Sequence, residues 1–327
     1  MAALVIAVVV LALVFDFLNG IHDSSNVVAT MISSRSFSPR VALGVTAAAE
    51  FSGPFLFGVA VAKTIGDEIV TAGAISTTVL IATLLSAILW NLLTWWLGFP
   101  SSSSHALIGG LIGSVTMAAG WQAIRMGGLE KILLTLFTSP LIGFLIGFVA
   151  LRLIYLLCWN ASPGVNWVFK RGQMLTGLAL ALSHGANDAQ KTMGIITLAL
   201  VTGGYLESFA VPLWVIVACA SMIALGTAVG GWRLIRTLGG KFYKIRPVHG
   251  FASQFASAVV ILGASLIGGP VSTTQVVSSA IMGVGAAERV NKVRWHVAQE
   301  IAVAWVLTIP SAALVGAGVY WLIDLVL

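Results

Sequence analysis

Two acidic motifs, half a chain apart, carry the residues best suited to chemistry in this sequence. Asp23 lies in NGIHDSSN and Asp188, 165 residues later, lies in HGANDAQK, so the two aspartates hold matching places in a duplicated unit. Each has an amide nearby, Asn26 in the first motif and Asn187 in the second. These four side chains, with carbonyl oxygens freed where a glycine lets a helix unwind, suit a small hard cation or a proton. The alternative is a buried aspartate that caps one half of a broken helix.

A second pair of motifs is rich in hydroxyl groups. PSSSSH at residues 100–105 recurs as PVSTTQ at residues 270–275, and each motif precedes an apolar, glycine-containing helix. A helix N-terminus offers unpaired N–H groups and partial positive charge, to which the hydroxyls add donors. Ordinary N-capping explains one hydroxyl at each helix, but not three or four. Two such helix ends that converge from the two halves would hold a tetrahedral oxyanion.

Few other ionisable side chains lie in apolar stretches, and each has two interpretations. Lys191 is the one base well placed near an anion, so charge balance should come from co-bound cations or protons, which favours symport over a passive pore. His105 and its counterpart Gln275 are candidates for a gate or a proton partner, or a satisfied helix-end pair. Glu50 is a proton carrier or a structural carboxyl. Asp16 is a pathway residue or a helix partner for Ser and Thr.

The composition indicates the environment of these motifs. Hydrophobic residues make up 58% of the 327 residues, charged residues 9%, and the mean hydropathy is +1.01. Continuous apolar runs of this kind predict a polytopic α-helical membrane protein. The predicted crossings span residues 2–32, 40–62, 69–97, 99–118, 132–157, 173–203, 211–232, 250–268, 269–286 and 299–325.

The net charge of +6 indicates topology, and we predict no nucleic-acid partner. With the N-terminus outside, the outer loops keep only Lys63, Arg125 and Lys131. The basic residues of the inner loops would be Arg35, Arg40, Arg152, Lys170, Arg171, Arg233, Arg236, Lys241, Lys244, Arg246, Arg289, Lys292 and Arg294. Both termini are then predicted outside a plasma membrane, the inner membrane in a Gram-negative cell.

The number of crossings decides how the halves are related. Five crossings in each half make the repeats inverted, whereas a re-entrant 99–118 would give four and leave Lys170 and Arg171 outside, so we favour five. The fold class is therefore all-α, with two inverted repeats that contain discontinuous or re-entrant helices. The predicted units are a first repeat (1–157), a short cytoplasmic connection (158–172) and a second repeat (173–327).

These motifs resemble the inorganic phosphate transporter family in its bacterial low-affinity form, over essentially the whole chain. The resemblance implies alternating access, symport of inorganic phosphate with Na⁺ or H⁺, and a homodimer in membrane lipid without a cofactor or enzyme activity. It implies coupling-ion roles for Asp23, Asn26 and Asp188, with Asp23 and Asp188 as metal ligands if the ion is Na⁺. The phosphate contacts that it implies are Ser102, Ser103, Ser104, Ser272, Thr273 and Thr274.

Several alternatives stay open from the sequence. Lys191 stands where the first motif has Asn26, so the second site lacks that amide and would be charge-balanced by the lysine. Oxygen cages suit Na⁺, whereas His22, His105 and His184 leave room for H⁺ or a neutral metal phosphate complex. Hydroxyls at helix ends bind any tetrahedral oxyanion, so a sulfate symporter of the same fold is the nearest alternative. An anion channel is less favoured.

Overall fold

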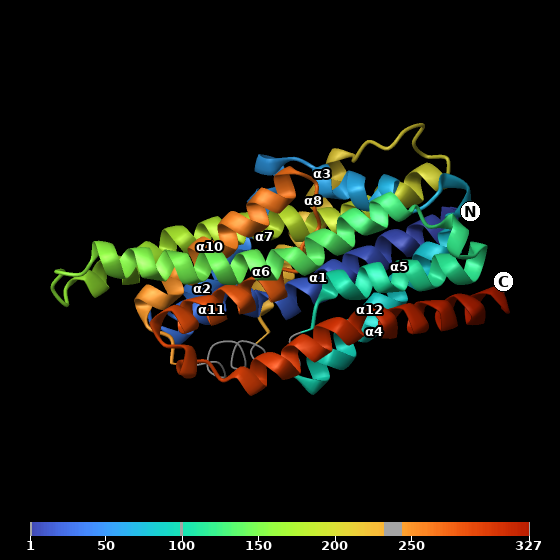
Figure 1. Ribbon diagram of the computed structural model, residues 1–327. Helices are drawn as coiled ribbons and strands as arrows, with labels where there is room; N and C mark the ends of the chain where they lie inside the picture. The colour runs from blue at the N-terminus through green and yellow to red at the C-terminus, as the bar shows by residue number, and fades with distance from the viewer. Residues whose placement is uncertain (1, 99–100, 232–243, 327) are drawn as a thin grey trace.

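The computed structural model is built from helices and describes residues 2–98, 101–231 and 244–326 (Figure 1). Five helices are long and apolar enough to cross a membrane, or six if a bent pair counts as one span. Pro100, Arg233, Arg236 and Lys241, which the sequence analysis singled out, lie outside the described residues. The helices are α1 (Ala2–Ser33), α2 (Pro39–Phe57), α3 (Ala60–Lys63), α4 (Thr77–Leu97), α5 (Ser103–Ala119), α6 (Met126–Leu157), α7 (Val165–Thr202), α8 (Leu213–Val229), α10 (Pro247–Leu266), α11 (Thr273–Glu288) and α12 (Trp295–Asp324).

One membrane helix is broken. The segment Ala60–Glu68, which contains α3 and a π-helical turn, is bent by 73° from α2. Gly58 lies at the break with a φ of +78°, a left-handed conformation that glycine adopts without steric cost. The prediction of a discontinuous helix is therefore confirmed.

Helices α4 and α5 form a hairpin, which we call hairpin 1 (residues 77–119). Its base lies at the end of the molecule where both chain termini are found (Figure 1), here called the terminal end. The flanking backbone closes this base, because Thr71 N donates to Ala123 O at 3.0 Å and Arg125 N donates to Ile69 O at 2.8 Å. The tip lies inside the molecule, where Gly98 ends α4 with a φ of +75°.

Helices α10 and α11 form the matching hairpin 2 (residues 247–288), whose base lies at the opposite end. Arg246 and Lys292 both contact Glu288 there, the Arg246 Nη2 to Glu288 Oε1 distance being 2.6 Å. Burial would raise the pKa of Glu288, but the hydrogen bond from Lys292 and the positive charges around it hold that pKa below its usual value. The carboxylate of Glu288 at the base of hairpin 2 therefore stays ionised near neutral pH.

The two hairpins correct the predicted crossings. Residues 99–118 and 269–286 do not cross by themselves, since α5 and α11 have only 17 and 16 residues and begin at the tips. The helices long and apolar enough to cross a membrane are α1, α4, α6 and the bent pair α2–α3 in the first half, and α10 and α12 in the second. The two hairpins are nevertheless inverted relative to each other, because their bases lie at opposite ends of the molecule.

Each hairpin packs against the last helix of the other repeat. A Cβ atom built on Gly113 of α5 would lie 1.9 Å from Ala313 O of α12. One built on Gly283 of α11 would lie 2.0 Å from Phe144 O of α6. Glycine at these positions lets the backbones touch, as is common between membrane helices.

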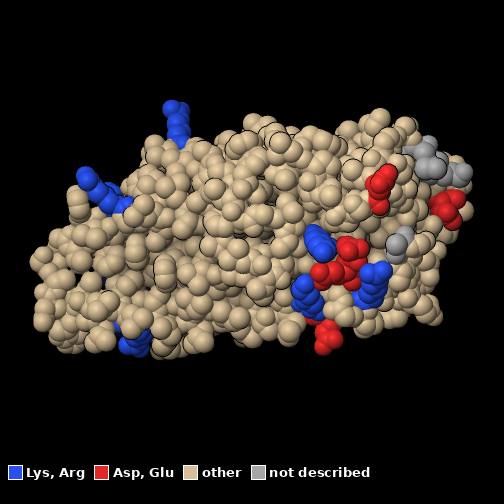
Figure 2. Space-filling model, turned by 90° about the horizontal axis from the view of Figure 1, so that it is seen from above, with Lys and Arg blue, Asp and Glu red and all other residues tan. Residues whose placement is uncertain are grey.

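The surface separates into a belt and two ends. Figure 2 shows Lys, Arg, Asp and Glu toward the two ends of the molecule, with a broad belt between them that carries none on this face. Exposed leucine, valine and tryptophan side chains, among them Leu141, Leu145 and Leu314, are what lipid would cover. Lys131 Nζ forms an ion pair with Glu68 Oε2 at 2.9 Å. At the end opposite the termini, the rings of Phe169 and Phe251 pack against each other.

Candidate ion and anion site

The two acidic motifs lie in unbroken helices. Asp23 lies in α1 and Asp188 in α7, and both helices run through the motifs without a gap. The expected unwinding is therefore wrong, and the motif glycines serve packing instead. A Cβ atom on Gly20 would lie 2.3 Å from Ile223 O, and one on Gly185 would lie 2.1 Å from Glu50 O. The carbonyl oxygens stay in helical hydrogen bonds, so ion ligands must come from side chains.

Asp23 receives hydroxyl groups from both hairpin tips. Its Oδ1 accepts from Thr274 Oγ1 and from Asn26 Nδ2, both at 2.9 Å. Its Oδ2 accepts from Ser103 Oγ of hairpin 1 and from Thr273 Oγ1 of hairpin 2, both at 3.3 Å. All of these side chains are at most 2% exposed. Four donors from three separate helices therefore converge on one buried carboxylate.

Asp188 shares one of these donors and has a base of its own. Lys191 Nζ donates to its Oδ1 at 2.6 Å, and Asn19 Nδ2 donates to its Oδ2 at 3.3 Å. Thr273 Oγ1 lies 3.4 Å from the same Oδ2. A hydroxyl has one hydrogen, so Thr273 can donate to Asp23 or to Asp188 but not to both. The carboxylate that receives no hydrogen from Thr273 then faces the lone pairs of the hydroxyl oxygen. A cation between these two oxygens would stabilise the arrangement.

Lys191 holds this carboxylate to both hairpin tips. Its ammonium group donates to Ser104 Oγ of hairpin 1 at 2.6 Å and to Val271 O of hairpin 2 at 3.0 Å. Ser104 Oγ in turn donates to Val271 O at 3.0 Å. The lysine is 2% exposed, so its charge acts mainly on Asp188 and not on solvent.

His184 lies between the two aspartates, whereas the sequence placed it only among the histidines that leave room for H⁺ or a neutral metal phosphate complex. Its Nε2 lies 3.4 Å from Asp188 Oδ2 and 3.8 Å from Asp23 Oδ2. Its Nδ1 lies 2.8 Å from Glu50 Oε1, and Thr227 donates to the other oxygen of Glu50. The available signal was the spacing, since His184 precedes Asp188 by four residues and so shares its helix face.

Asp23, His184 and Asp188 lie close enough together to hold a metal ion. One ligand atom from each of the three lies within 4.8 Å of the others, and all three side chains are buried. The hydroxyls of Ser103 and Thr273 add oxygens at the Asp23 side of this group. Carboxylate and hydroxyl oxygens fit a hard cation such as Na⁺, with the imidazole as a second-best ligand.

We call the group of Asp23, His184 and Asp188 the ion cage. The other residues predicted for the site lie either at the hairpin tips or near this cage. Asn187 is not in the cage, because its amide donates to Ser265 Oγ at 2.9 Å and accepts from Val271 N at 3.2 Å. Ser102 and Ser272 are N-caps that accept from the N–H groups of the third residue after them. The tip side chains His105 and Gln275 lie 3.3 Å apart. Capping thus explains one hydroxyl in each motif, while Ser103, Thr273 and Thr274 face Asp23.

Comparison with known proteins agrees with this duplicated site. The phosphate transporter family matches the chain twice, over residues 19–167 and 159–316. The chain belongs to the phosphate transporter family. It is 43% identical to a protein of Bacillus subtilis (strain 168) over 99% of the chain and 98% of the relative, and 44% identical to one of Rhizobium meliloti (strain 1021) over 99% and 97%. Both relatives are named probable low-affinity inorganic phosphate transporter.

A solved structure matches the fold of this family member. It is titled the sodium-dependent phosphate transporter, is 26% identical, and superposes with a TM-score of 0.92 over 99% of the chain and 100% of its own. The family membership makes the chain a multi-span membrane transporter and not an enzyme, as the sequence predicted.

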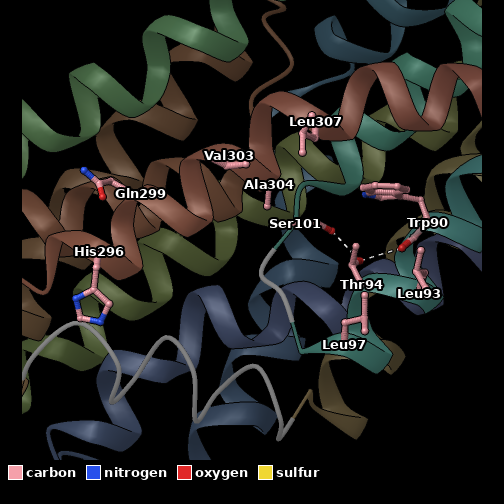
Figure 3. Close-up of a pocket in the computed structure, with 10 residues that line it drawn as sticks. All are labelled: Trp90, Leu93, Thr94, Leu97, Ser101, His296, Gln299, Val303, Ala304 and Leu307. Carbon is pink, nitrogen blue, oxygen red and sulfur yellow. Dashed lines mark hydrogen bonds between the residues drawn. The ribbon is translucent and has the colours of Figure 1, made fainter.

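The phosphate transporter fold also leaves a cavity of about 770 Å³ beside the tip of hairpin 1 (Figure 3). Ser101 at the tip donates to Thr94 of α4 at 2.8 Å, and Thr94 donates to Trp90 O at 2.9 Å. His296 and Gln299 of α12 line the other side, and most of the remaining wall is apolar. Among the described residues that line this cavity there is no Lys, Arg, Asp or Glu.

Proposed function

We propose that this chain carries inorganic phosphate across the membrane by Na⁺ symport with alternating access. One observation carries the proposal: hydroxyls from two oppositely inserted hairpins meet at a single carboxylate, Asp23. The solved relative is described as a sodium-dependent phosphate transporter, which supports Na⁺ as the ion. The names of the bacterial relatives support inorganic phosphate as the substrate.

The coupling of phosphate binding to Na⁺ follows from the negative charges of Asp23 and Asp188 in a buried site. A phosphate beside Asp23 and Asp188 would be repelled unless cations neutralise the carboxylates, because the interior screens charge poorly. With Na⁺ on Asp23, the hydroxyls of Ser103 and Thr273 no longer need the carboxylate and are free to donate to phosphate. The N-termini of α5 and α11 add N–H groups that favour an anion. Phosphate then binds well only when the cation is present.

Alternation follows from the placement of the hairpins. Hairpin 1 is closed at the terminal end and hairpin 2 at the opposite end, while both tips reach the same site. Displacing one tip would open the site toward one side of the membrane, and displacing the other tip would open it toward the other side. The loops that carry Lys244, Arg289 and Arg294 would face the cytoplasm, and both termini would face outward.

The working unit that we propose is a homodimer in the plasma membrane. Each subunit would have a first repeat at residues 1–157, a cytoplasmic connection at 158–172 that includes the first residues of α7, and a second repeat at 173–327. The residues in contact with substrate would be Ser103, Ser104, Thr273 and Thr274, with Ser102 and Ser272 as the caps that aim the helix ends. The pair of His105 and Gln275 would act as a gate between the tips.

Purified protein in proteoliposomes tests the proposal. An imposed inward Na⁺ gradient at equal pH should drive accumulation of radiolabelled phosphate, and excess arsenate should compete better than sulfate. Accumulation that responds to sulfate as strongly as to arsenate would indicate a general oxyanion carrier. Phosphate flux that is independent of Na⁺ and of pH would overturn symport.

A further inference from the structure

A fourth carboxyl group lies outside the ion cage. Asp16 precedes Asp23 by seven residues, about two turns of α1 toward the terminal end, and is fully buried. Its Oδ1 accepts a hydrogen bond from Thr192 Oγ1 of α7. Its Oδ2 is buried and receives no hydrogen bond from a nitrogen or oxygen of the described residues, the one nearby donor being the weak thiol donor of Cys219. The mechanism proposed above does not use this group.

The surroundings of Asp16 contain nothing that balances a negative charge by contact. Ala12 and Phe15 of α1, Met193 of α7 and Ile223 of α8 belong to one buried apolar cluster at this level. The thiol of Cys219 on α8 faces the carboxyl group. No Lys, Arg or His in the described parts of the chain forms an ion pair with it; Asp188 and Lys191 of α7 act only from a distance. An ionised Asp16 would be a bare charge in an apolar environment.

The atoms around Asp16 suit a proton better than a metal cation. Hard metal cations need about six oxygen ligands, whereas this site offers one carboxylate and one hydroxyl beside a thiol. A proton needs only one oxygen, and it removes the charge altogether. Thr192 directly follows Lys191, so a shift of Lys191 when the cage binds its ions would reach the Asp16 site through α7.

We propose that Asp16 is a separate proton site, which adds one H⁺ to the Na⁺-coupled phosphate cycle. A proton from water on one side forms an O–H bond with Asp16 Oδ2, and that bond breaks to a water molecule when the site opens to the other side. The inference rests on the proposed phosphate symport for its transport test, although proton binding itself can be measured without transport.

The test combines two measurements on purified, full-length protein. Infrared difference spectra over a pH titration should contain a protonated-carboxyl band that Asp16→Asn removes and Asp324→Asn, at an exposed control carboxyl, retains. In proteoliposomes with a Na⁺ gradient and fixed pH, a trapped pH dye and radiolabelled phosphate give the number of protons per phosphate. Asp16→Asn should carry one proton fewer per phosphate than wild type, and Asp16→Glu should restore it.

Each failure has its own signature. If wild type takes up no phosphate in a Na⁺ gradient, the proposed function fails. The infrared band still shows whether Asp16 binds a proton. An unchanged proton-to-phosphate ratio together with an unchanged band in Asp16→Asn would overturn the proton site. Should Asp16→Asn fold poorly, Thr192→Val replaces it: loss of the donated hydrogen bond destabilises the ionised form, so the band should persist to higher pH. A band that titrates as in wild type would contradict the proposal.

Discussion

Replacing Lys191 with Met gives the sharpest test of how the site balances its charge. Lys191 and Asp188 are both buried, and their charged atoms lie 2.6 Å apart. The substitution keeps the length of the side chain but leaves Asp188 as an uncompensated charge. Removing one partner of a buried ion pair costs about 3–5 kcal/mol of folding free energy. Lys191→Met should therefore unfold at a clearly lower denaturant concentration than wild type.

A double-mutant cycle separates charge from hydrogen bonding. Lys191→Met also loses the bonds to Ser104 Oγ and Val271 O, each worth about 1 kcal/mol. In Lys191→Met with Asp188→Asn the bare charge is gone, so the double variant should lose only about 1–2 kcal/mol, less than Lys191→Met alone, and the Asp188→Asn single variant completes the cycle. Ser104→Ala, which removes one neutral partner, is the matched control at about 1 kcal/mol.

Unfolding free energies in detergent, with and without NaCl, measure these quantities. Na⁺ can replace the missing ammonium charge at Asp188, so NaCl should stabilise Lys191→Met more than it stabilises wild type, with choline chloride as the ionic-strength control. Two results would refute the reasoning. One is equal stability of the single and double variants, and the other is a salt response of Lys191→Met identical in Na⁺ and choline.

Four further predictions concern coupling, substrate, packing and topology. Asp23→Asn should abolish accumulation of phosphate against a gradient, measured by uptake into proteoliposomes, because a neutral amide cannot balance a cation. Ser103→Ala and Thr273→Val should each weaken phosphate binding by about 1–3 kcal/mol, a factor of roughly 5 to 150, and should combine non-additively in calorimetry; an effect confined to one half would contradict a shared anion. Gly113→Ala should lower the thermal stability, since its Cβ would lie 1.9 Å from a carbonyl oxygen. Lys244→Cys should resist an impermeant thiol reagent added outside sealed cells, and ready labelling would reverse the orientation.

Duplication made much of the fold predictable. A motif that occurs twice at matched spacing marks an internal repeat, and the apolar run length marks membrane helices whatever their packing. The same reasoning placed the hydroxyl clusters at helix N-termini, where the structure has them. It could not separate a short spanning helix from half of a hairpin, because a 17-residue apolar helix suits both. That difference depends on where α4 turns, which is a tertiary property.

The sequence could not predict which residues of the site contact each other. Gly20 and Gly185 were taken as points of unwinding, since glycine permits it, but their role depends on the backbones of α8 and α2 lying against them. Asn187 was grouped with Asp188 because the two are adjacent in sequence. Neighbouring residues on a helix point about 100° apart, and Asn187 consequently reaches the tip of hairpin 2. His184, four residues away, shares the face of Asp188.

The exchange of partners between the repeats has a consequence for biogenesis. Hairpin 1 rests on α12, which is synthesised after all the other described helices, so its glycine face at Gly109 and Gly113 lacks its neighbour until α12 has been made. Hairpin 2, in contrast, emerges when its support α6 is already in the membrane. The early half of the chain must therefore wait in the bilayer in an unfinished form, and a ribosome that stops before α12 leaves a product in which the glycine face of α5 has no partner helix.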